Sequence, residues 1–441
     1  MNEGFSFIHA ADLHLDSPFR GYGQIDFADA ATRENVLRQL RDCTFTALDN
    51  IVRACLARRV DFLVLAGDIY DLADRSLRAQ LRFQNAMEQL AEAGIPVFVA
   101  HGNHDHDDGR WAALTWPDSV YFFSPGEVAA RPVVRRGLEI ARIYGISYPR
   151  RDVHENYASL FKREPNVPFA LAVLHCNVGG NAEHANYAPC GLEELVRAGF
   201  DYWALGHVHS RRLLCKQNPC VVYPGNPQGR NPRETGARGC YLVRVNTGGA
   251  IKLEFLAMDG VRWEQVRVPI DGLATEQELL ERIDEQLAVL RYRHDGRSVV
   301  ARLELTGRGV LHRSLRYDGV PEGILEEMRC RFAGPEGSFV WLESIRCSTG
   351  LAVDKEALRN SETLLGDLLA ISRQARESRG TAGGRDGEMR DMLRQVLAPL
   401  HHRIARHIPL PEDDEFDALL EAAEDMALDL LWEQEDNEGN G

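Results

Sequence analysis

The chain has 441 residues, a length that suggests two or three domains rather than a single core. Hydrophobic residues make up 44% of it, as in an ordinary globular protein, and no stretch is long and apolar enough to span a bilayer. The nine cysteines include no Cys-x-x-Cys pair, which argues against a disulfide framework and a structural zinc site. Because the N-terminus also lacks a signal-peptide pattern, we expect a protein of the reducing cytoplasm with no membrane partner.

The formal net charge of −15 is distributed unevenly along the chain. Residues 1–250 sum to −1, and residues 201–250 alone sum to +5. Residues 411–441 carry thirteen acidic side chains and no Lys or Arg. The acidity therefore belongs mainly to the end of the chain, and the first half is free to meet an anionic ligand.

Three short apolar runs in the first hundred residues are typical of buried parallel strands. We expect strands at 5–11, 63–68 and 95–100, separated by amphipathic helices at 32–58 and 76–93. This order predicts a βαβαβ unit. Because the carboxyl ends of parallel strands meet at one edge of the sheet, the polar residues that follow each run are expected to lie together there.

The sharpest of these strand ends is Gly67-Asp68, where glycine lets the backbone turn tightly and delivers a carboxylate to the sheet edge. A lone Gly-Asp is more often a solvated turn. Here, however, further runs at 170–174 and 202–205 also end in polar residues. The candidate ligands, in chain order, are Asp12, His14, Asp68, Asn103, His175, His207 and His209.

Beyond residue 110 the pattern loosens. Short strands are expected at 120–123 and 138–146, and strands of a second sheet at 221–223 and 240–245. The character of the chain changes again near residue 261. Residues 262–350 read as a small α+β module, with strands at 263–268, 298–305 and 339–345, a helix opened by the capping box Thr275–Glu278, and a helix at 322–333. Residues 355–441 read as helical, with helices at 354–377, 388–407 and 414–433 and a glycine-rich hinge at 380–387.

The seven candidate ligands suggest two metal ions. Carboxylate, imidazole and amide oxygen without thiolate suit Mn²⁺, Fe²⁺ or Zn²⁺, and four imidazoles disfavour a pure Mg²⁺ site. Seven ligands are too many for one ion, but they suit two ions about 3.5–4 Å apart that share a bridging carboxylate. Such a pair activates a water molecule and neutralises charge on phosphate oxygens during in-line attack.

The order of the motifs resembles the calcineurin-like metallophosphoesterases and, within them, the SbcD/YhaO-type DNA repair exonuclease family. The motifs are Ala11–Asp16, Ala66–Asp71, His101–Asp105, His175–Gly179, Gly206–His209 and Tyr223–Asn226. They span roughly residues 8–230, and the later modules agree only in general architecture. The resemblance implies an α/β fold: a two-sheet α/β sandwich catalytic domain over 1–255, a capping module over 262–350 and a helical region over 355–441.

The resemblance also assigns roles. Asp12, His14 and His209 would hold one metal, Asn103, His175 and His207 the other, and Asp68 would bridge them, with Mn²⁺ the favoured ion. His104 resembles the non-ligand histidine of the family, which would assist the leaving-group oxygen or stabilise the transition state. A protonated imidazole suits that task near neutral pH. We expect Asp105 to orient the His104 ring.

Other polar residues have simpler interpretations. We expect Asp16 and Asp71 to support the site or its turns, and Cys176 to pack in the core. His101 and His106 are interpreted as loop or packing residues, and His184, His401 and His402 as solvated. The basic residues after the last ligand motif are either a solvated rim or phosphate contacts to DNA. They are Arg211, Arg212, Lys216, Arg230, Arg233 and Arg238.

Three functions remain open from the sequence: a metal-dependent DNA exonuclease or endonuclease of repair, a hydrolase of nucleotides or other small phosphoesters, and a non-catalytic scaffold. The intact ligand set disfavours the scaffold. The resemblance implies a coiled-coil ATPase partner of the SMC/Rad class, and a homodimer is left open. An apolar stripe on the last helix either binds that partner or packs on its own domain. It comprises Phe416, Leu419, Leu420, Ala423, Ala427, Leu430 and Leu431. The acidic tail is not expected in the path of nucleic acid.

Overall fold

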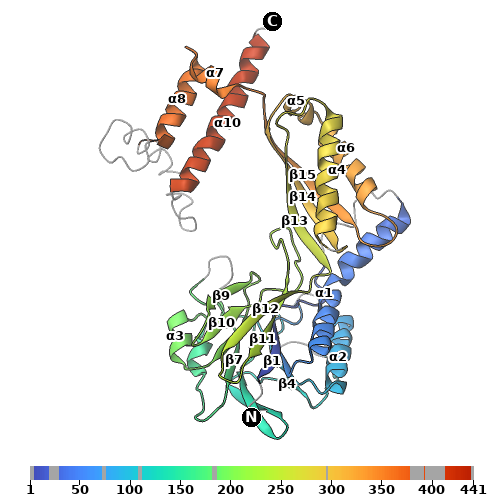
Figure 1. The fold of residues 1–441 in the computed structure, drawn as a ribbon, viewed down its shortest axis with the longest axis vertical. Coiled ribbons are helices and arrows are strands. Elements are labelled where there is room, and N and C mark those ends of the chain that lie inside the picture. The colour runs from blue at the N-terminus through green and yellow to red at the C-terminus, as the bar shows by residue number, and fades with distance from the viewer. Residues whose placement is uncertain are drawn as a thin grey trace. The chain divides into compact units, whose positions relative to one another are not determined.

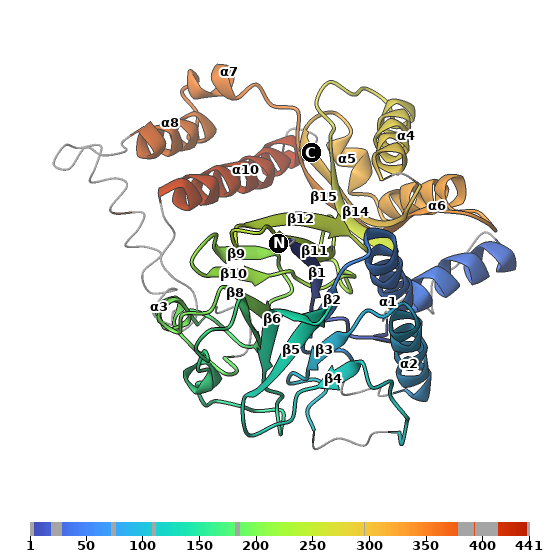
Figure 2. The same ribbon diagram turned by 60° about the horizontal axis from the view of Figure 1, so that its bottom comes forward.

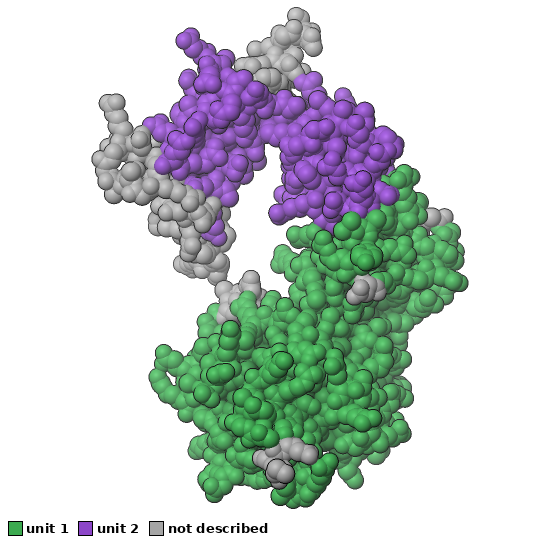
Figure 3. Space-filling view, in the orientation of Figure 1, with its two compact units in different colours: residues 1–265, 287–302, 327–343 green, residues 266–286, 303–326, 344–441 purple. Residues whose placement is uncertain are grey.

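The computed structural model describes residues 4–18, 29–71, 76–107, 112–180, 186–294, 296–377, 392 and 413–438. The chain divides into two compact units (Figure 3). Unit 1 comprises residues 1–265, 287–302 and 327–343, and unit 2 comprises residues 266–286, 303–326 and 344–441. No helix within the described ranges has the length and apolarity to cross a membrane.

A six-stranded mixed sheet forms the first layer of unit 1 (Figure 1). Its order is β12 (Ile251–Ala257), β11 (Gly239–Val245), β1 (Phe5–Ala10), β2 (Phe62–Ala66), β3 (Val97–Ala100) and β4 (Val120–Phe122). Strands β1 to β4 pair in parallel, whereas β11 runs antiparallel to β1. The predicted βαβαβ unit is therefore present, with all its carboxyl ends at one edge.

A second six-stranded sheet forms the other layer. Its order is β5 (Ala129–Arg135), β6 (Leu138–Gly145), β7 (Ala170–His175), β8 (Tyr202–Gly206), β10 (Cys220–Tyr223) and β9 (Arg212–Cys215). Strands β6, β7, β8 and β10 are parallel neighbours. The two further strands that carry ligand motifs, β7 and β8, therefore also deliver them to a common edge.

Alternation along the strands separates two cores. Ile8, Leu63 and Val97 lie in one cluster with side chains of the helices α1 (Ala30–Arg58) and α2 (Leu77–Glu92). Their neighbours Phe7 and Val64 lie instead in a cluster with residues of the second sheet. Because successive side chains of a strand point to opposite faces, one face of the first sheet is covered by helices and the other by the second sheet. This is the predicted two-sheet α/β sandwich (Figure 2).

Both helices begin at the caps that their sequences supply. The Asp29 carboxylate accepts hydrogen bonds from the backbone N–H of Ala31 and Thr32, each at 2.8 Å, and opens α1. Ser76 Oγ accepts from the N–H of Ala79 at 3.0 Å and opens α2. These starts lie within two residues of the predicted ones.

A third sheet has the order β13 (Val261–Pro269), β14 (Ser298–Arg308) and β15 (Val340–Gly350). Its helices are α4 (Glu276–Arg293), α5 (His312–Leu315) and α6 (Val320–Phe332). The boundary between the two compact units falls within each of these three strands. In unit 1, Val36 and Leu40 of α1 share a buried cluster with Trp263, Val300 and Trp341.

The C-terminal part of unit 2 contains α7 (Lys355–Arg359), α8 (Leu364–Glu377) and α10 (Asp413–Glu438). The prediction of one helix over 354–377 is wrong, because the chain breaks at Ser361. There Ser361 Oγ donates to the carbonyl of Leu358 at 2.6 Å, and Thr363 Oγ1 accepts from the N–H of Gly366 at 3.1 Å. Local side-chain bonds of this kind compete with helix continuation.

One further prediction of a strand is wrong, and strand β5 is missing from the predictions. The strand expected at 240–245 is not part of the second sheet, because β11 pairs with β1 in the first sheet. Strand β5 is not predicted, because Pro132 and several small residues obscure the apolar pattern of a strand. In the structure it forms a hairpin with β6, and the two turn residues Arg136 and Gly137 both have the positive φ that a tight hairpin requires. The hinge at 380–387, His184, His401, His402 and, except for Met392, the helix at 388–407 fall outside the described residues.

Candidate metal centre

Strained backbone marks the strand ends that carry the candidate ligands. Asp12 (φ 54°), His14 (φ 43°), Asp68 (φ 52°) and His207 (φ 99°) all have positive φ. Non-glycine residues are uncommon there, and such conformations gather at functional sites because surrounding contacts over-determine them. Asp12 is an example: its N–H donates to the carbonyl of Gly67 at 3.0 Å, which ties the end of β1 to the end of β2.

Two glycines let these strand ends approach one another closely. A Cβ on Gly206 would stand 1.7 Å from the carbonyl oxygen of Ala66. A Cβ on Gly102 would stand 2.4 Å from Oδ1 of Asp68. Neither separation is tolerable for a carbon atom. Glycine at 206 therefore allows β8 of the second sheet to approach β2 of the first, and glycine at 102 leaves room for the Asp68 carboxylate and the His175 ring.

The candidate ligands converge in a buried cluster. Nε2 of His14 lies 3.2 Å from Nε2 of His209 and 3.8 Å from Oδ2 of Asp68. The same Asp68 oxygen lies 3.4 Å from Nε2 of His175, which is 2.9 Å from Oδ1 of Asn103. Of the remaining two, Asp12 has an oxygen 3.9 Å from Nδ1 of His175.

His207 completes the set. Its backbone N–H donates to Oδ1 of Asp12 at 2.9 Å, and its ring centroid is 5.2 Å from that of His175. Within the described residues, three groups of side chains present ligand atoms within 4.8 Å of one another. They are Asp12, His14 and His209; His14, Asp68 and His104; and Asp12, Asp68 and His175. Asp12, His14 and Asp68 each belong to two of these groups, so the groups overlap, and the assignment of Asp68 as the bridging carboxylate stays a prediction.

Burial and charge perturb the cluster in opposite directions. Burial lowers the pKa of His14, and the Arg230 guanidinium lowers it further. Burial acts to raise the pKa of Asp68, but His175, His104 and His14 together outweigh it and hold that pKa well below its usual range. Conversely, burial opposes protonation of His175, yet Asp68 raises the pKa of His175 to about 9. The cluster thus holds carboxylate charge in a buried space that favours a compensating cation.

His104 lies beside this cluster, but its partner differs from the predicted one. The expectation that Asp105 orients the ring is wrong. Instead Nδ1 of His104 is 2.7 Å from Oδ1 of Asp71. Asp105 is fully buried and turned back toward the strand ends, where it accepts from the N–H groups of Gly102 (2.6 Å) and Ile69 (2.7 Å). Asp105 lies close after the end of β3, where backbone N–H groups of the strand ends are within hydrogen-bond distance of its carboxylate.

Glu234 is a site residue that the sequence analysis missed. Its Oε1 lies 2.8 Å from Nδ1 of His209, and its Oε2 accepts from Nδ2 of Asn226 at 2.8 Å. Burial acts to raise the pKa of Glu234, but the hydrogen bond and electrostatic attraction of His209, together with Arg230, outweigh it and lower that pKa to about 2. A carboxylate on the far nitrogen of a ligating imidazole fixes its tautomer and orientation. The motif Tyr223–Asn226 pointed to this loop, but not to Glu234.

The basic residues after the last motif are dispersed. The Arg230 side chain reaches the site, where Nη1 donates to Oδ2 of Asp71 at 3.1 Å. Arg238 instead donates to the carbonyl of His209 at 2.6 Å, and Arg211 lies over the ring of Phe255 at 3.9 Å. Lys216 and Arg233 are exposed, and Arg212 is half-buried on β9.

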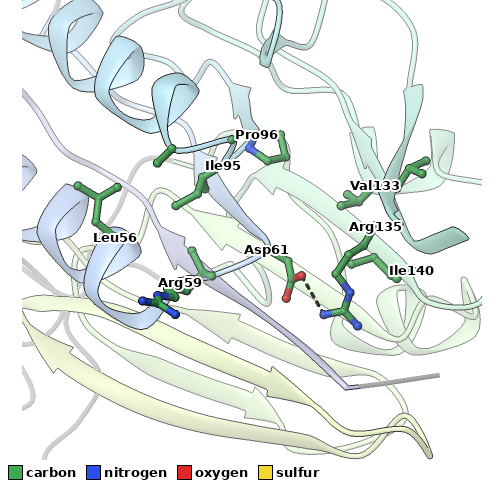
Figure 4. Close-up of a pocket in the computed structure, with 12 residues that line it drawn as sticks. Leu56, Arg59, Asp61, Ile95, Pro96, Val133, Arg135 and Ile140 are labelled. Atoms are coloured by element: carbon green, nitrogen blue, oxygen red, sulfur yellow. Dashed lines mark hydrogen bonds and ion pairs between the residues drawn. The ribbon is translucent and has the colours of Figure 1, made fainter. Parts of the chain in front are cut away.

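A separate hollow of about 490 Å³ lies at the opposite end of the first sheet. It is lined by residues that precede β2 and β3, among them Asp61 and Pro96, and by the β5–β6 hairpin (Figure 4). Arg135 Nη1 donates to Oδ1 of Asp61 there at 3.0 Å. Because these are the amino ends of the strands, the hollow is no part of the ligand cluster.

Comparison with known proteins identifies the family. A family model described as calcineurin-like phosphoesterase matches residues 5–211, and one described as the middle domain of metallophosphoesterase YhaO matches residues 263–350. The uncharacterized metallophosphoesterase YhaO of Bacillus subtilis (strain 168) is 38% identical over 336 residues, which cover 76% of this chain and 80% of that protein. The chain belongs to the calcineurin-like phosphoesterases.

Two more distant relatives of this phosphoesterase carry nuclease or repair names. The DNA double-strand break repair protein Mre11 of Methanopyrus kandleri is 26% identical over 305 residues, covering 62% of this chain and 61% of that protein. A component of the nuclease SbcCD of Bacillus subtilis is 22% identical over 280 residues, covering 55% of this chain and 66% of that protein. Each alignment spans less than two thirds of the relative.

The phosphoesterase fold implies a divalent metal pair, and the side chains fit one. The donor set consists of imidazole nitrogens, carboxylate oxygens and an amide oxygen, with Nε2 of His14 and Nε2 of His209 facing each other at 3.2 Å. Such a pair supplies an activated water and neutralises charge on phosphate oxygens. The Asp68 carboxylate is held in place by the backbone N–H of His104, which donates to Oδ1 of Asp68 at 2.8 Å.

Proposed function

We propose that this phosphoesterase cleaves phosphodiester bonds of DNA, as an exonuclease or endonuclease that acts in repair. The observation that carries the proposal is the convergence of the seven predicted ligands, with His104 beside them. Five of the seven belong to the overlapping groups, Asn103 and His207 adjoin His175, and the N–H of His104 donates to Asp68. The repair and nuclease names of the Mre11 and SbcCD relatives support DNA as the substrate.

His104 is proposed to act on the leaving group. Its Nδ1 faces Asp71 at 2.7 Å, which leaves Nε2 as the ring nitrogen available to substrate. Burial opposes protonation of His104, but the hydrogen bond with Asp71 and the negative charges of Asp68 and Asp71 together outweigh it and raise the pKa of the ring. The ring can therefore carry a proton near neutral pH and donate it to the alkoxide that leaves when the phosphodiester breaks.

We propose Mn²⁺ as the working ion, with Fe²⁺ or Zn²⁺ as alternatives, because the donor set combines imidazole with carboxylate and contains no thiolate. The proposed compartment is the cytoplasm, a choice supported by nine cysteines that are all free thiols.

The proposed partner is a coiled-coil ATPase of the SMC/Rad class, which would contact α10. Phe416 is 1% exposed, whereas Leu419, at 52%, and Leu430, at 60%, are largely exposed. The predicted apolar stripe is therefore divided, and its exposed part is available to another helix. Self-association into a homodimer is a separate proposal that these residues do not address.

The test of the nuclease function is Mn²⁺-dependent degradation of end-labelled single- and double-stranded DNA. We expect degradation by the wild type, and a loss of about 10²- to 10⁴-fold for His104→Ala, because a positioned general acid contributes that much. Asp68→Ala should abolish activity and metal binding together.

Two outcomes would contradict the proposal. Hydrolysis of only nucleotides or other small phosphoesters by the wild type would replace DNA with a small substrate. Full activity of Asp68→Ala with both metals retained would overturn the role of Asp68 between two ions.

A further inference from the structure

Arg230 enters the site from the loop that follows β10, and its guanidinium meets Asp71. Nη1 donates to Oδ2 of Asp71 at 3.1 Å and lies 3.4 Å from Oγ of Ser17. Ser17 Oγ in turn donates to the same Asp71 oxygen at 3.1 Å. The other Asp71 oxygen is the one that faces His104. Asp71 therefore has one oxygen held by Arg230 and Ser17 and the other directed at the imidazole.

The loop fixes the backbone of Arg230, and the side chain is held in a largely buried position. The backbone N–H donates to Oε2 of Glu234 at 2.8 Å, and Nη2 lies 3.5 Å from Nδ1 of His209. The side chain is only 17% exposed. The single Nη1 contact holds one oxygen of Asp71, and the anchored backbone and the burial of the side chain limit the movement of the guanidinium.

We propose that Arg230 is a positioning residue: it locks Asp71, and Asp71 locks the His104 ring with Nδ1 turned inward and Nε2 turned to the substrate. This inference rests on the proposed phosphodiesterase activity of the same site. The competing role is direct contact with a substrate phosphate, since Nε of Arg230 is buried and has no hydrogen-bond partner within the described parts of the chain.

A double-mutant cycle separates the two roles. The substrate is bis(p-nitrophenyl) phosphate with Mn²⁺, so the measurement does not depend on DNA binding. Arg230→Ala is expected to lower kcat about 10- to 100-fold, as loss of a supporting partner does, with KM changed by less than about twofold. The double variant Arg230→Ala/Asp71→Asn should lose no more kcat than Asp71→Asn alone, because both residues act through the His104 ring. A raised KM with additive losses would establish phosphate contact instead and overturn the proposal.

Two variants guard against a trivial loss of structure. Arg230→Lys should recover part of kcat, because an ammonium still reaches one Asp71 oxygen. Arg197→Ala removes an exposed arginine that pairs with Glu193 on the surface of α3 (Leu192–Arg197), and it should leave kcat and KM unchanged. Metal content and melting temperature are measured for each variant. If Arg230→Ala loses kcat only in proportion to lost metal, the positioning role fails.

A second measurement needs no turnover. With ¹⁵N-labelled histidine, and His104→Gln to assign the signal, the Nδ1–H resonance of His104 is expected in the wild type and in Arg230→Lys. It should broaden or disappear in Arg230→Ala. An unchanged resonance would refute the positioning role. If the wild type degrades neither DNA nor the model phosphodiester, the proposed function fails, while the resonance still decides the role of Arg230.

Discussion

At the scale of single residues, the loop from Asn226 to Arg238 supports the metal centre from behind. Glu234 touches Nδ1 of His209, and Arg238 holds the carbonyl of the same residue at 2.6 Å. His209 is therefore fixed at its ring and at its backbone by two side chains of one loop. Such support keeps the Nε2 lone pair of the imidazole directed at the cluster before any ion arrives, which lowers the entropy lost on binding.

This arrangement predicts the effect of Glu234→Gln. Glutamine keeps the volume but loses the carboxylate charge that selects the Nδ1–H tautomer of His209. We expect metal affinity to fall about 10- to 100-fold. Isothermal titration with Mn²⁺ measures it directly. Glu193→Gln, whose side chain is 84% exposed, is the matched control and should bind as the wild type does. Unchanged affinity in Glu234→Gln would mean that His209 is oriented without this carboxylate.

The sequence predicted the residues that the structure clusters, but few of their supports. Asp12, Asp68 and His175 lie at the ends of apolar runs, so strand position alone places them at the sheet edge. Glu234 lies 25 positions after His209 in a loop without periodicity, and nothing local marks its direction. Asp71 matched a motif, but the sequence does not show whether Asp71 or Asp105 faces His104. In the structure backbone N–H groups bind the Asp105 carboxylate, and Asp71 is the one that faces the ring.

At the scale of elements, the site exists because two sheets bring their carboxyl ends together. The parallel order β1, β2, β3 was predictable, since each strand is a bare apolar run separated by a helix. The pairing of β11 with β1 was not, because an antiparallel strand has the same apolar pattern whichever sheet it joins. Long-range pairing of this kind is decided by which edge remains open.

The packing of α8 against α10 gives a prediction at this scale. Leu428 is 0% exposed and lies in one cluster with Leu365 and Leu369. Leu428→Ala should destabilise this helix pair by about 2–5 kcal/mol, because it leaves a cavity between the helices. Leu430→Ala, two positions on and 60% exposed, should cost less than about 0.5 kcal/mol.

Amide hydrogen exchange of α8 measures the difference, because local opening reports the stability of this pair separately from the sandwich. Protection should fall in Leu428→Ala and stay near the wild-type level in Leu430→Ala. Equal protection in the two variants would show that α10 does not stabilise α8.

At the scale of the whole molecule, the candidate chemistry is confined to unit 1. All seven predicted ligands, His104 and Arg230 lie within residues 1–265. The acidic α10 belongs to unit 2, and its carboxylates form ion pairs with residues of the same unit. Lys355 Nζ, for example, lies 2.9 Å from Oε1 of Glu424. Charge is thus segregated along the chain in the manner that the sequence indicated, and metal binding should be felt by only one of the two units.

Metal removal tests that segregation. An ion that binds the folded state at 100 times its dissociation constant stabilises it by about 2.7 kcal/mol. Chelation by EDTA should therefore lower the melting temperature of the transition that includes unit 1 by a few degrees. It should leave amide exchange in α8 and α10 unchanged. Re-addition of Mn²⁺ should restore the wild type but not Asp68→Ala, whose melting temperature should no longer respond to the ion. A shift of equal size in Asp68→Ala would place the stabilising ion outside the cluster. A loss of protection in α8 on chelation would show that the two units are energetically coupled through the occupied site.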